Sequence, residues 1–173
     1  MIYLDNAATT ALSPAAIESM TQAMTIFGNP SSTHSHGREA NKLLRQARED
    51  IAKVLHTQSK NVLFTSGGTE SNNTAIKGYA LRHQDQGKHI ITTAIEHHAV
   101  LEPVEYLVEH FGFESTIIQP VDGQIRIEDI KNALRPDTIL VSVMAVNNET
   151  GYILPIQEIG ELLKDHPAAF HVD

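Results

Sequence analysis

Apolar residues recur along this chain in two alternating patterns. Short runs of apolar and β-branched residues bounded by turn residues predict strands. Stretches in which apolar residues return every three or four positions predict helices, and the longest of these carries its apolar residues on one face. The predicted strands are 61–65, 89–94, 113–118, 138–146 and 168–172, and the predicted helices are 14–27, 40–55, 69–82, 99–110, 126–134 and 155–164.

The alternation of strands and helices predicts an α/β fold. The predicted strands are nearly continuous apolar runs, which is typical of strands that are buried on both faces. We therefore expect a three-layer sandwich, in which helices cover both faces of a mostly parallel sheet. The last predicted strand reaches the end of the chain without a following helix to cover it, so we expect the chain to be part of a longer protein.

Composition and charge exclude several classes of protein. The 173 residues carry a formal charge of −8 and no run of Lys or Arg, which argues against nucleic acid or an anionic membrane as a partner. The chain has no cysteine and therefore no disulfide. We find no signal-peptide pattern at the N-terminus and no apolar stretch near the roughly 20 residues of a membrane span. We expect a cytoplasmic protein.

Polar residues gather after the predicted strands. In an open parallel sheet, ligands bind beyond the carboxyl ends of the strands. The segments that follow four of the predicted strands are "SGGTESNN" (66–73), "AIEHH" (94–98), "NNETG" (147–151) and Asp173. Because these segments should meet at one edge of the sheet, the sequence predicts a single candidate site there.

The glycine pair Gly67-Gly68 indicates how this site could hold an anion. Glycine allows a tight turn and lets backbone N–H groups approach a ligand, and the helix predicted to begin near Thr69 would offer unpaired N–H groups to a phosphate. The stretch matches neither the Walker A motif nor the dinucleotide fingerprint. An ordinary strand-to-helix turn, capped by Ser66 or Thr69, explains the same residues, and the residues alone leave both interpretations open.

The histidine pair His97-His98 is equally ambiguous. Either ring could cap a helix, lie flat on a planar ligand, or join Glu96 and Asp173 around a metal, but the spacing matches no zinc signature and metal is the weaker choice.

Asp173 is more informative, because a carboxylate at the end of a buried strand needs a partner. A protonated ring nitrogen of a ligand would serve, and so would His171 or a backbone N–H. A phosphate cradle, a stacking ring, an amide and a carboxylate at one edge describe the wall of a pyridoxal phosphate site.

Six motifs carry a resemblance to a known family. They are "YLDNAATT" (3–10), "GNPSSTHSHGREA" (28–40), "FTSGGTESNN" (64–73), "TTAIEHHAVL" (92–101), "VSVMAVNNETG" (141–151) and "FHVD" (170–173). In this order they closely resemble cysteine desulfurases, which belong to the class V branch of the fold-type I pyridoxal-phosphate enzymes. The resemblance implies that residues 1–173 are part of the cofactor-binding large domain, with 1–30 as an N-terminal segment and active-site loop and 31–173 as alternating strands and helices.

The resemblance also implies roles for individual residues. Gly68 and Thr69 would bind the cofactor phosphate. His97 would stack on the pyridine ring and act in proton transfer, as the catalytic residue of this segment. Asn148 would hydrogen-bond the ring hydroxyl, and Asp173 would pair with the ring nitrogen. No metal is implied.

In such enzymes, L-cysteine is converted to L-alanine and the sulfur leaves as a cysteine persulfide. The persulfide serves iron–sulfur cluster assembly or the thiolation of tRNA and cofactors, so the resemblance implies a sulfur-acceptor or scaffold protein as a partner. The resemblance also implies that the full-length protein is a homodimer. The chain lacks the nucleophilic cysteine, and none of its lysines has the setting of the Schiff-base lysine. We therefore expect the 173 residues to be inactive alone.

Three alternatives stay open at this point. Selenocysteine lyase, or another class V enzyme, would share the cofactor and much of the scaffold. A phosphate-ligand binding module without catalysis would explain the missing lysine and cysteine. A metallohydrolase built on His97, His98 and Asp173 ranks far behind the other two.

Overall fold

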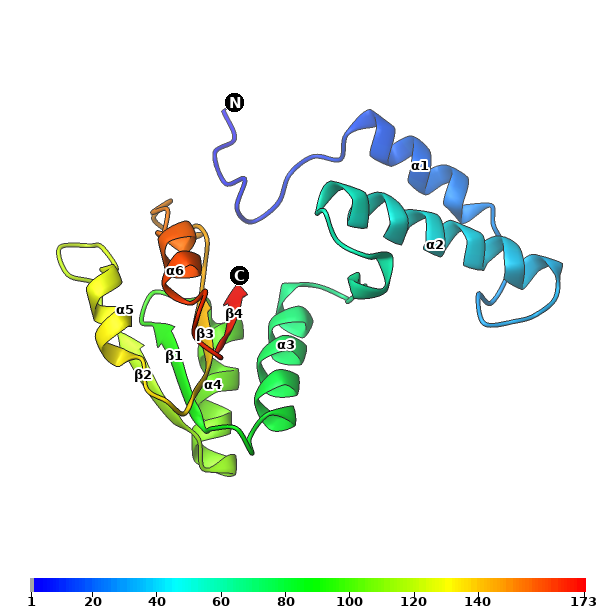
Figure 1. Ribbon diagram of the computed structural model, residues 1–173. Coiled ribbons are helices and arrows are strands. Elements are labelled where there is room, and N and C mark those ends of the chain that lie inside the picture. The colour runs from blue at the N-terminus through cyan, green and yellow to red at the C-terminus, as the bar shows by residue number, and fades with distance from the viewer. Residues whose placement is uncertain (1) are drawn as a thin grey trace. The chain divides into compact units, whose positions relative to one another are not determined.

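The computed structural model describes residues 2–173, which form two compact units (Figure 1). The first unit extends to Phe64 and the second spans Thr65–Asp173. All five residues singled out for a cofactor site lie in the second unit. In residues 2–173, no helix combines the length and the apolar character needed to cross a membrane.

The first unit contains two helices and one short 3-10 turn: α1 (Pro14–Met24), α2 (Ser35–Val54) and η1 (Ser59–Asn61). Ser13 caps α1, since its Oγ accepts a hydrogen bond from the Ala16 N–H at 3.2 Å, and Pro14 occupies the first helical position. The sequence predicted both helices. Helix α1 ends three residues earlier than expected, at Met24.

The strand predicted at 61–65 is wrong, because residues 62–65 have no regular secondary structure. Leu63 and Phe64 are 71% and 43% exposed. A strand exists only when another strand pairs with its backbone, and no strand in residues 2–173 pairs with this segment. The local apolar pattern indicates an extended backbone, but it does not show whether another strand is present to pair with it.

The second unit is an α/β layer structure. Its elements are α3 (Gly68–Arg82), β1 (His89–Thr93), α4 (His98–Phe111), β2 (Glu114–Ile118), α5 (Ile127–Ala133), β3 (Thr138–Val143), α6 (Ile156–Leu162) and β4 (Ala169–Val172). The four strands pair in the order β2-β1-β3-β4, and every pair is parallel. This confirms the predicted parallel sheet. Strand β3 ends three residues before the predicted limit, because Val146 leaves the sheet to form a bridge with Ile153.

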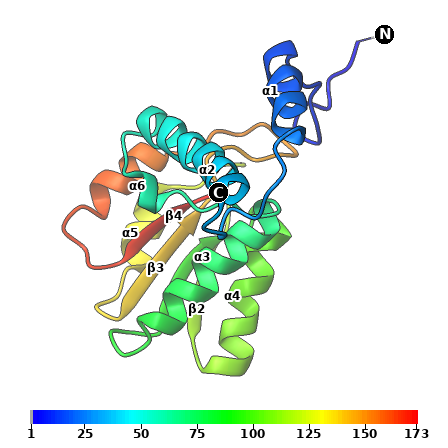
Figure 2. The ribbon, with the colours of Figure 1, turned by 90° about the vertical axis from the view of Figure 1, so that its right-hand side faces the viewer.

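Helices cover both faces of this sheet (Figure 2). Ile90 of β1 and Leu140 of β3 pack in a cluster with residues of α3 and α4, including Ile76 and Val100. The next residues along the two strands, Ile91 and Val141, point to the opposite face and pack with residues of α5 and α6. The three-layer sandwich predicted from the sequence is therefore confirmed.

The topology decides where functional side chains can gather. All four strands run in the same direction, so their carboxyl ends lie at one edge of the sheet. Six residues separate the end of α3 from the start of β1, so α3 runs back along the sheet and begins at the same edge (Figure 1). The residues that follow β1, β3 and β4 also lie there.

Candidate functional site

The start of α3 is open and unobstructed. Gly67 is the cap residue and makes no side-chain bond, so neither Ser66 nor Thr69 caps this helix. A Cβ built on Gly67 or Gly68 would meet no atom within 4 Å. The first N–H groups of a helix have no acceptor within the helix and carry a partial positive charge. This helix end can therefore receive an anion.

A carboxylate holds the loop in front of α3. Glu70 accepts hydrogen bonds from the backbone N–H of Ser66, at 2.7 Å, and from its hydroxyl. These bonds lower the pKa of Glu70, with the hydroxyl as the largest cause and the N–H next. The Oγ atoms of Thr65 and Ser71 lie 2.6 Å apart. The Thr65 hydroxyl also donates to the Gly67 carbonyl at 3.2 Å, so side chains fasten this loop through that carbonyl and the Ser66 N–H, and not through the N–H groups of Gly67 and Gly68.

His97 is the cap residue of α4 and follows β1 by four positions. Its Nδ1 accepts a hydrogen bond from the Ala99 N–H at 3.0 Å, while the residue is exposed. An Nδ1 that accepts has no hydrogen, so the neutral ring carries its proton on Nε2. The same ring can therefore cap α4 through Nδ1 and offer an Nε2–H group to a ligand. The His98 ring lies edge-on to it, with centroids 6.3 Å apart.

Asn147 and Asn148 have different environments. Asn147 is 7% exposed; its Nδ2 donates to the Ile95 carbonyl at 2.8 Å, and its Oδ1 accepts from the N–H groups of Glu149 and Thr150. Asn148 is exposed on the turn that Asn147 anchors. Asn147 was not predicted as a site residue, because two adjacent asparagines in a turn do not show which one is buried.

Asp173 follows β4, and its backbone carbonyl accepts from the Ala145 N–H at 2.8 Å. The neighbouring His171 uses Nδ1 to contact Ser142 Oγ at 2.8 Å, so this ring nitrogen is engaged by a hydroxyl. Burial lowers the pKa of His171, and the charge of Asp173 opposes that shift. The residue Asp173 is itself exposed at the sheet edge.

Glu96 is the buried carboxyl of this edge. It is 7% exposed, and its Oε1 accepts from the Thr93 hydroxyl at 2.7 Å and from the Met144 N–H at 3.0 Å. Oε2 is buried without a hydrogen-bond partner. From the sequence, Glu96 was a candidate only for the weaker metal hypothesis. Its position two residues after the predicted strand 89–94 was the available signal that it is buried.

The structure thus brings the predicted residues to one edge of the sheet. His97 lies beyond β1, Asn148 beyond β3 and Asp173 beyond β4, while Gly68 and Thr69 begin α3 at the same edge. Among residues 2–173, no three His, Cys, Asp or Glu side chains are grouped as they would be to hold a metal ion.

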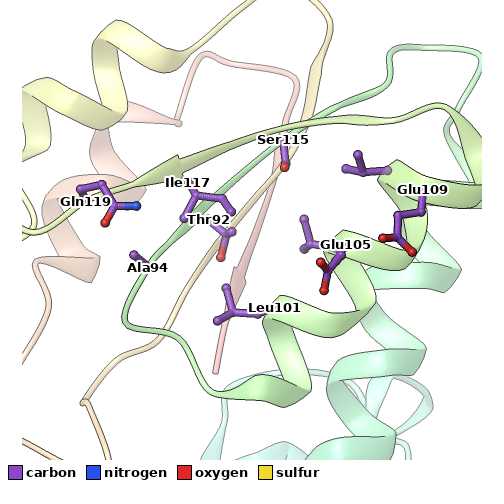
Figure 3. A pocket seen from close by; sticks show the side chains of 10 residues that line it. Thr92, Ala94, Leu101, Glu105, Glu109, Ser115, Ile117 and Gln119 are labelled. Atoms are coloured by element: carbon purple, nitrogen blue, oxygen red, sulfur yellow. The ribbon is translucent and has the colours of Figure 1, made fainter.

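A separate cavity of about 590 Å³ lies between α4 and the strands β1 and β2 (Figure 3). Its walls include Glu105 and Glu109 of α4, Ser115 of β2 and the hydroxyl-bearing Thr92 of β1. It contains none of the five predicted residues. Thr92 Oγ1 is buried without a hydrogen-bond partner, so a wall of this cavity includes an unsatisfied hydroxyl.

Comparison with known proteins identifies the family. The model of the class-V aminotransferase family matches residues 2–173. The chain belongs to the class-V aminotransferase family. Among curated relatives, cysteine desulfurase IscS of Dictyoglomus turgidum is 51% identical over 175 residues, which cover 99% of this chain and 44% of the relative.

Solved structures agree with this assignment. A NifS-like protein is 39% identical with a TM-score of 0.93, and the match covers 99% of this chain and 48% of that one. A structure described as SspA in complex with cysteine is also 39% identical, with a TM-score of 0.91 and coverage of 99% and 50%. The resemblance to cysteine desulfurases is confirmed. This chain spans about half the length of the relatives that it matches.

Proposed function

We propose that this chain is part of a pyridoxal-phosphate-dependent cysteine desulfurase and that its sheet edge forms one wall of the cofactor site. The observation that carries the proposal is the parallel topology. Three adjacent strands, β1, β3 and β4, deliver His97, Asn148 and Asp173 to the edge at which α3 begins. The similarity to cysteine desulfurase IscS of Dictyoglomus turgidum supports it.

The residues fit the chemical groups of pyridoxal phosphate. The open start of α3, at Gly68 and Thr69, suits the dianionic phosphate. The Asn148 amide would donate to the ring hydroxyl, and the Asp173 carboxylate would pair with a protonated ring nitrogen. The bound cofactor supplies an electron sink, which this ring-nitrogen pair maintains.

His97 has a defined part in this arrangement. Its Nδ1 is engaged by the Ala99 N–H, so the ring stays in one orientation and presents Nε2–H outward. The ring face can stack on a planar pyridine, and Nε2 can hold or transfer a proton at the reacting end of the ligand. We propose His97 as the catalytic residue of this segment.

The proposed reaction converts L-cysteine to L-alanine and passes sulfur on as a persulfide, for iron–sulfur cluster assembly or thiolation of tRNA and cofactors. It requires a lysine for the cofactor and a nucleophilic cysteine, and the chain contains no cysteine. We therefore propose that the 173 residues alone are inactive, and that the complete gene product works as a homodimer with a sulfur-acceptor or scaffold protein. The complex of the related SspA with cysteine supports this substrate.

The test uses the complete gene product, incubated with pyridoxal phosphate and L-cysteine. We expect a yellow protein that releases alanine and, with a thiol reductant, sulfide in equal amounts. Asp173→Ala should weaken cofactor binding, and His97→Ala should lower turnover more than cofactor affinity. A protein that binds no pyridoxal phosphate would contradict the proposal. Preferential release of selenide from selenocysteine would instead identify the related lyase.

A second candidate function is a phosphate-ligand binding module without catalysis. The observation that favours it is the absence of cysteine from the chain. Binding of pyridoxal phosphate without turnover of cysteine, in the complete gene product, would support this candidate over the desulfurase.

A further inference from the structure

We propose that Glu96 is a positioning residue, whose buried carboxyl joins the segment after β1 to the segment after β3 and so sets the spacing between His97 and Asp173. The part of this inference that concerns the cofactor rests on the proposed function. The part that concerns the joint between the two segments rests on the described contacts alone.

Two hydrogen bonds to Glu96, from Thr93 and from Met144, form this joint between the segments that follow β1 and β3. Glu96 Oε1 accepts from the Thr93 hydroxyl at the last position of β1 and from the Met144 N–H directly after β3. One carboxyl oxygen thus bridges two neighbouring parallel strands at the point where their ladder ends. Asn147 adds a second link between the same two segments, since its Nδ2 donates to the Ile95 carbonyl.

The joint reaches both proposed cofactor contacts. His97 is the next residue after Glu96, so the position of the Glu96 backbone fixes where α4 and its cap begin. On the other side, Met144 is followed by Ala145, whose N–H donates to the Asp173 carbonyl at 2.8 Å. A shift of the Glu96 carboxyl would therefore move the His97 backbone relative to that of Asp173.

The second oxygen of Glu96 indicates the charge state that the joint requires. Oε2 is buried without a partner, and an ionised oxygen in that position would be poorly solvated. Burial is the main cause that raises the pKa of Glu96 to about 7; the bonds from Met144 and Thr93 oppose it, and the charge of Asp173 adds to it. The Thr93 hydroxyl and the Met144 amide, which bond to the carboxyl, are neutral. Asp173, the residue after β4, is the charged group that affects the carboxyl. The titratable residues next to Glu96 in the chain are His97 and His98, at the start of α4. Glu96 is thus largely protonated below neutral pH.

This proton gives a signature that a purely apolar structural residue would not show. Glu96 in the folded protein holds its proton to a higher pH than the unfolded chain, whose ordinary value is 4.5. The contribution of Glu96 to stability is fully present below that value, declines as the pH rises from 4.5 to about 7, and is constant above. Glutamine has nearly the shape of a protonated glutamate and does not titrate, so Glu96→Gln should keep the joint and remove this decline.

The test compares Glu96→Gln, Glu96→Ala and, as a matched control, Glu102→Gln, an exposed carboxyl on α4. Each variant of the complete gene product, freed of cofactor, is unfolded with urea between pH 4.5 and 8 and then titrated with pyridoxal phosphate. We expect the stability of the wild type and of Glu102→Gln, each measured relative to Glu96→Gln, to decline over that range. We expect Glu96→Gln to bind the cofactor within about threefold of the wild type, and Glu96→Ala to bind about tenfold more weakly, because two buried donors lose their acceptor.

Three results would overturn the proposal. The first is a folded Glu96→Ala protein with wild-type cofactor affinity, and the second is a Glu96→Gln protein that loses about tenfold in affinity at pH 6. The third is a wild-type and a Glu96→Gln protein with the same dependence of stability on pH. If Glu96→Ala does not fold, the Glu96→Gln comparison decides alone. If no variant, including the wild type, binds pyridoxal phosphate, the proposed function fails while the unfolding series still tests the joint.

Discussion

Glu96 and Asp173 are hydrogen-bonded to consecutive peptide groups of the segment that leaves β3. The Glu96 carboxyl accepts from the Met144 N–H at 3.0 Å, and the Asp173 carbonyl accepts from the Ala145 N–H at 2.8 Å. Two residues 77 positions apart in the chain are thereby held by adjacent backbone donors. The side chain of Asp173 takes no part in this contact, so it is available for a cationic ligand.

Asp173→Asn should separate these two properties of Asp173. The backbone contact with Ala145 stays, but the charge for a protonated ring nitrogen is lost. A hydrogen bond to a charged group is worth about 1.5–3 kcal/mol, so we expect the affinity of the complete gene product for pyridoxal phosphate to fall about ten- to hundredfold, as measured by equilibrium titration. Asp165→Asn, an exposed aspartate before β4, is the matched control. Equal affinities for the two variants would show that Asp173 does not contact the cofactor.

Two consecutive threonines at the end of β1 should respond oppositely to the same substitution. Thr92 Oγ1 is buried without a partner, whereas the Thr93 hydroxyl donates to Glu96. We expect Thr92→Val to leave the free energy of unfolding unchanged or to raise it by about 1 kcal/mol, and Thr93→Val to lower it by about 1–3 kcal/mol. Urea unfolding of both variants measures the difference. A larger loss for Thr92→Val would mean that its hydroxyl has a partner in solution.

At the opposite end of the sheet, a buried histidine joins three strands. His89 is fully buried; its Nδ1 lies 2.7 Å from Thr138 Oγ1 and its Nε2 lies 2.9 Å from Thr116 Oγ1. Burial is the largest cause that lowers the pKa of His89, with the Arg135 charge next. The unfolded chain therefore binds a proton more readily. The stability that His89 contributes is fully present above the ordinary pKa of 6.5 and is lost as the pH falls below it.

His89→Gln should remove this dependence on pH. We expect the variant to be less stable than the wild type by about 1–3 kcal/mol at pH 8, since Gln cannot bridge both threonines, and the difference to shrink at pH 5. Urea unfolding across this range measures it, and His110→Gln, at an exposed position of α4, is the control. A difference that stays constant from pH 8 to pH 5 would show that His89 is not buried in its neutral form.

Two glycines test the packing of the second unit. A Cβ on Gly87 would lie 2.2 Å from the Asp137 carbonyl oxygen, a backbone atom whose displacement would distort the chain. A Cβ on Gly78 of α3 would meet nothing within 4 Å. We expect Gly87→Ala to destabilise the protein by about 1–3 kcal/mol and Gly78→Ala to stabilise it by up to about 1 kcal/mol, because alanine favours a helix. Thermal unfolding of the two variants should move in opposite directions. Equal shifts would contradict the close approach of the Gly87 backbone to Asp137.

The sequence was sufficient for those parts of the fold that local patterns determine. The strands at 89–93, 114–118, 138–143 and 169–172 were all predicted, because short runs of β-branched and apolar residues mark each of them. Only β1 and β3 are buried along their whole length, whereas the edge strands β2 and β4 are partly exposed. The segment 62–65 has the same composition but no partner, and pairing is not a local property. The direction of the strands was also predictable, which is why His97, Asn148 and Asp173 could be assigned to one edge.

The supporting contacts of the site could not be predicted. Glu96 and Asn147 each bond to groups about 50 residues away, the Met144 N–H and the Ile95 carbonyl. Adjacent polar residues in one motif, such as Asn147 and Asn148, differ only in the direction of the side chain. That direction depends on neighbouring strands, which the motif itself does not contain.

The most direct test of the central claim is a crystal structure of the complete gene product with pyridoxal phosphate. We predict that the phosphate will accept hydrogen bonds from the backbone at Gly68 and Thr69, that the His97 ring will stack on the pyridine, and that the ring nitrogen will lie against the Asp173 carboxylate. A cofactor bound elsewhere, with the start of α3 and Asp173 contacting different molecules or none, would contradict the account.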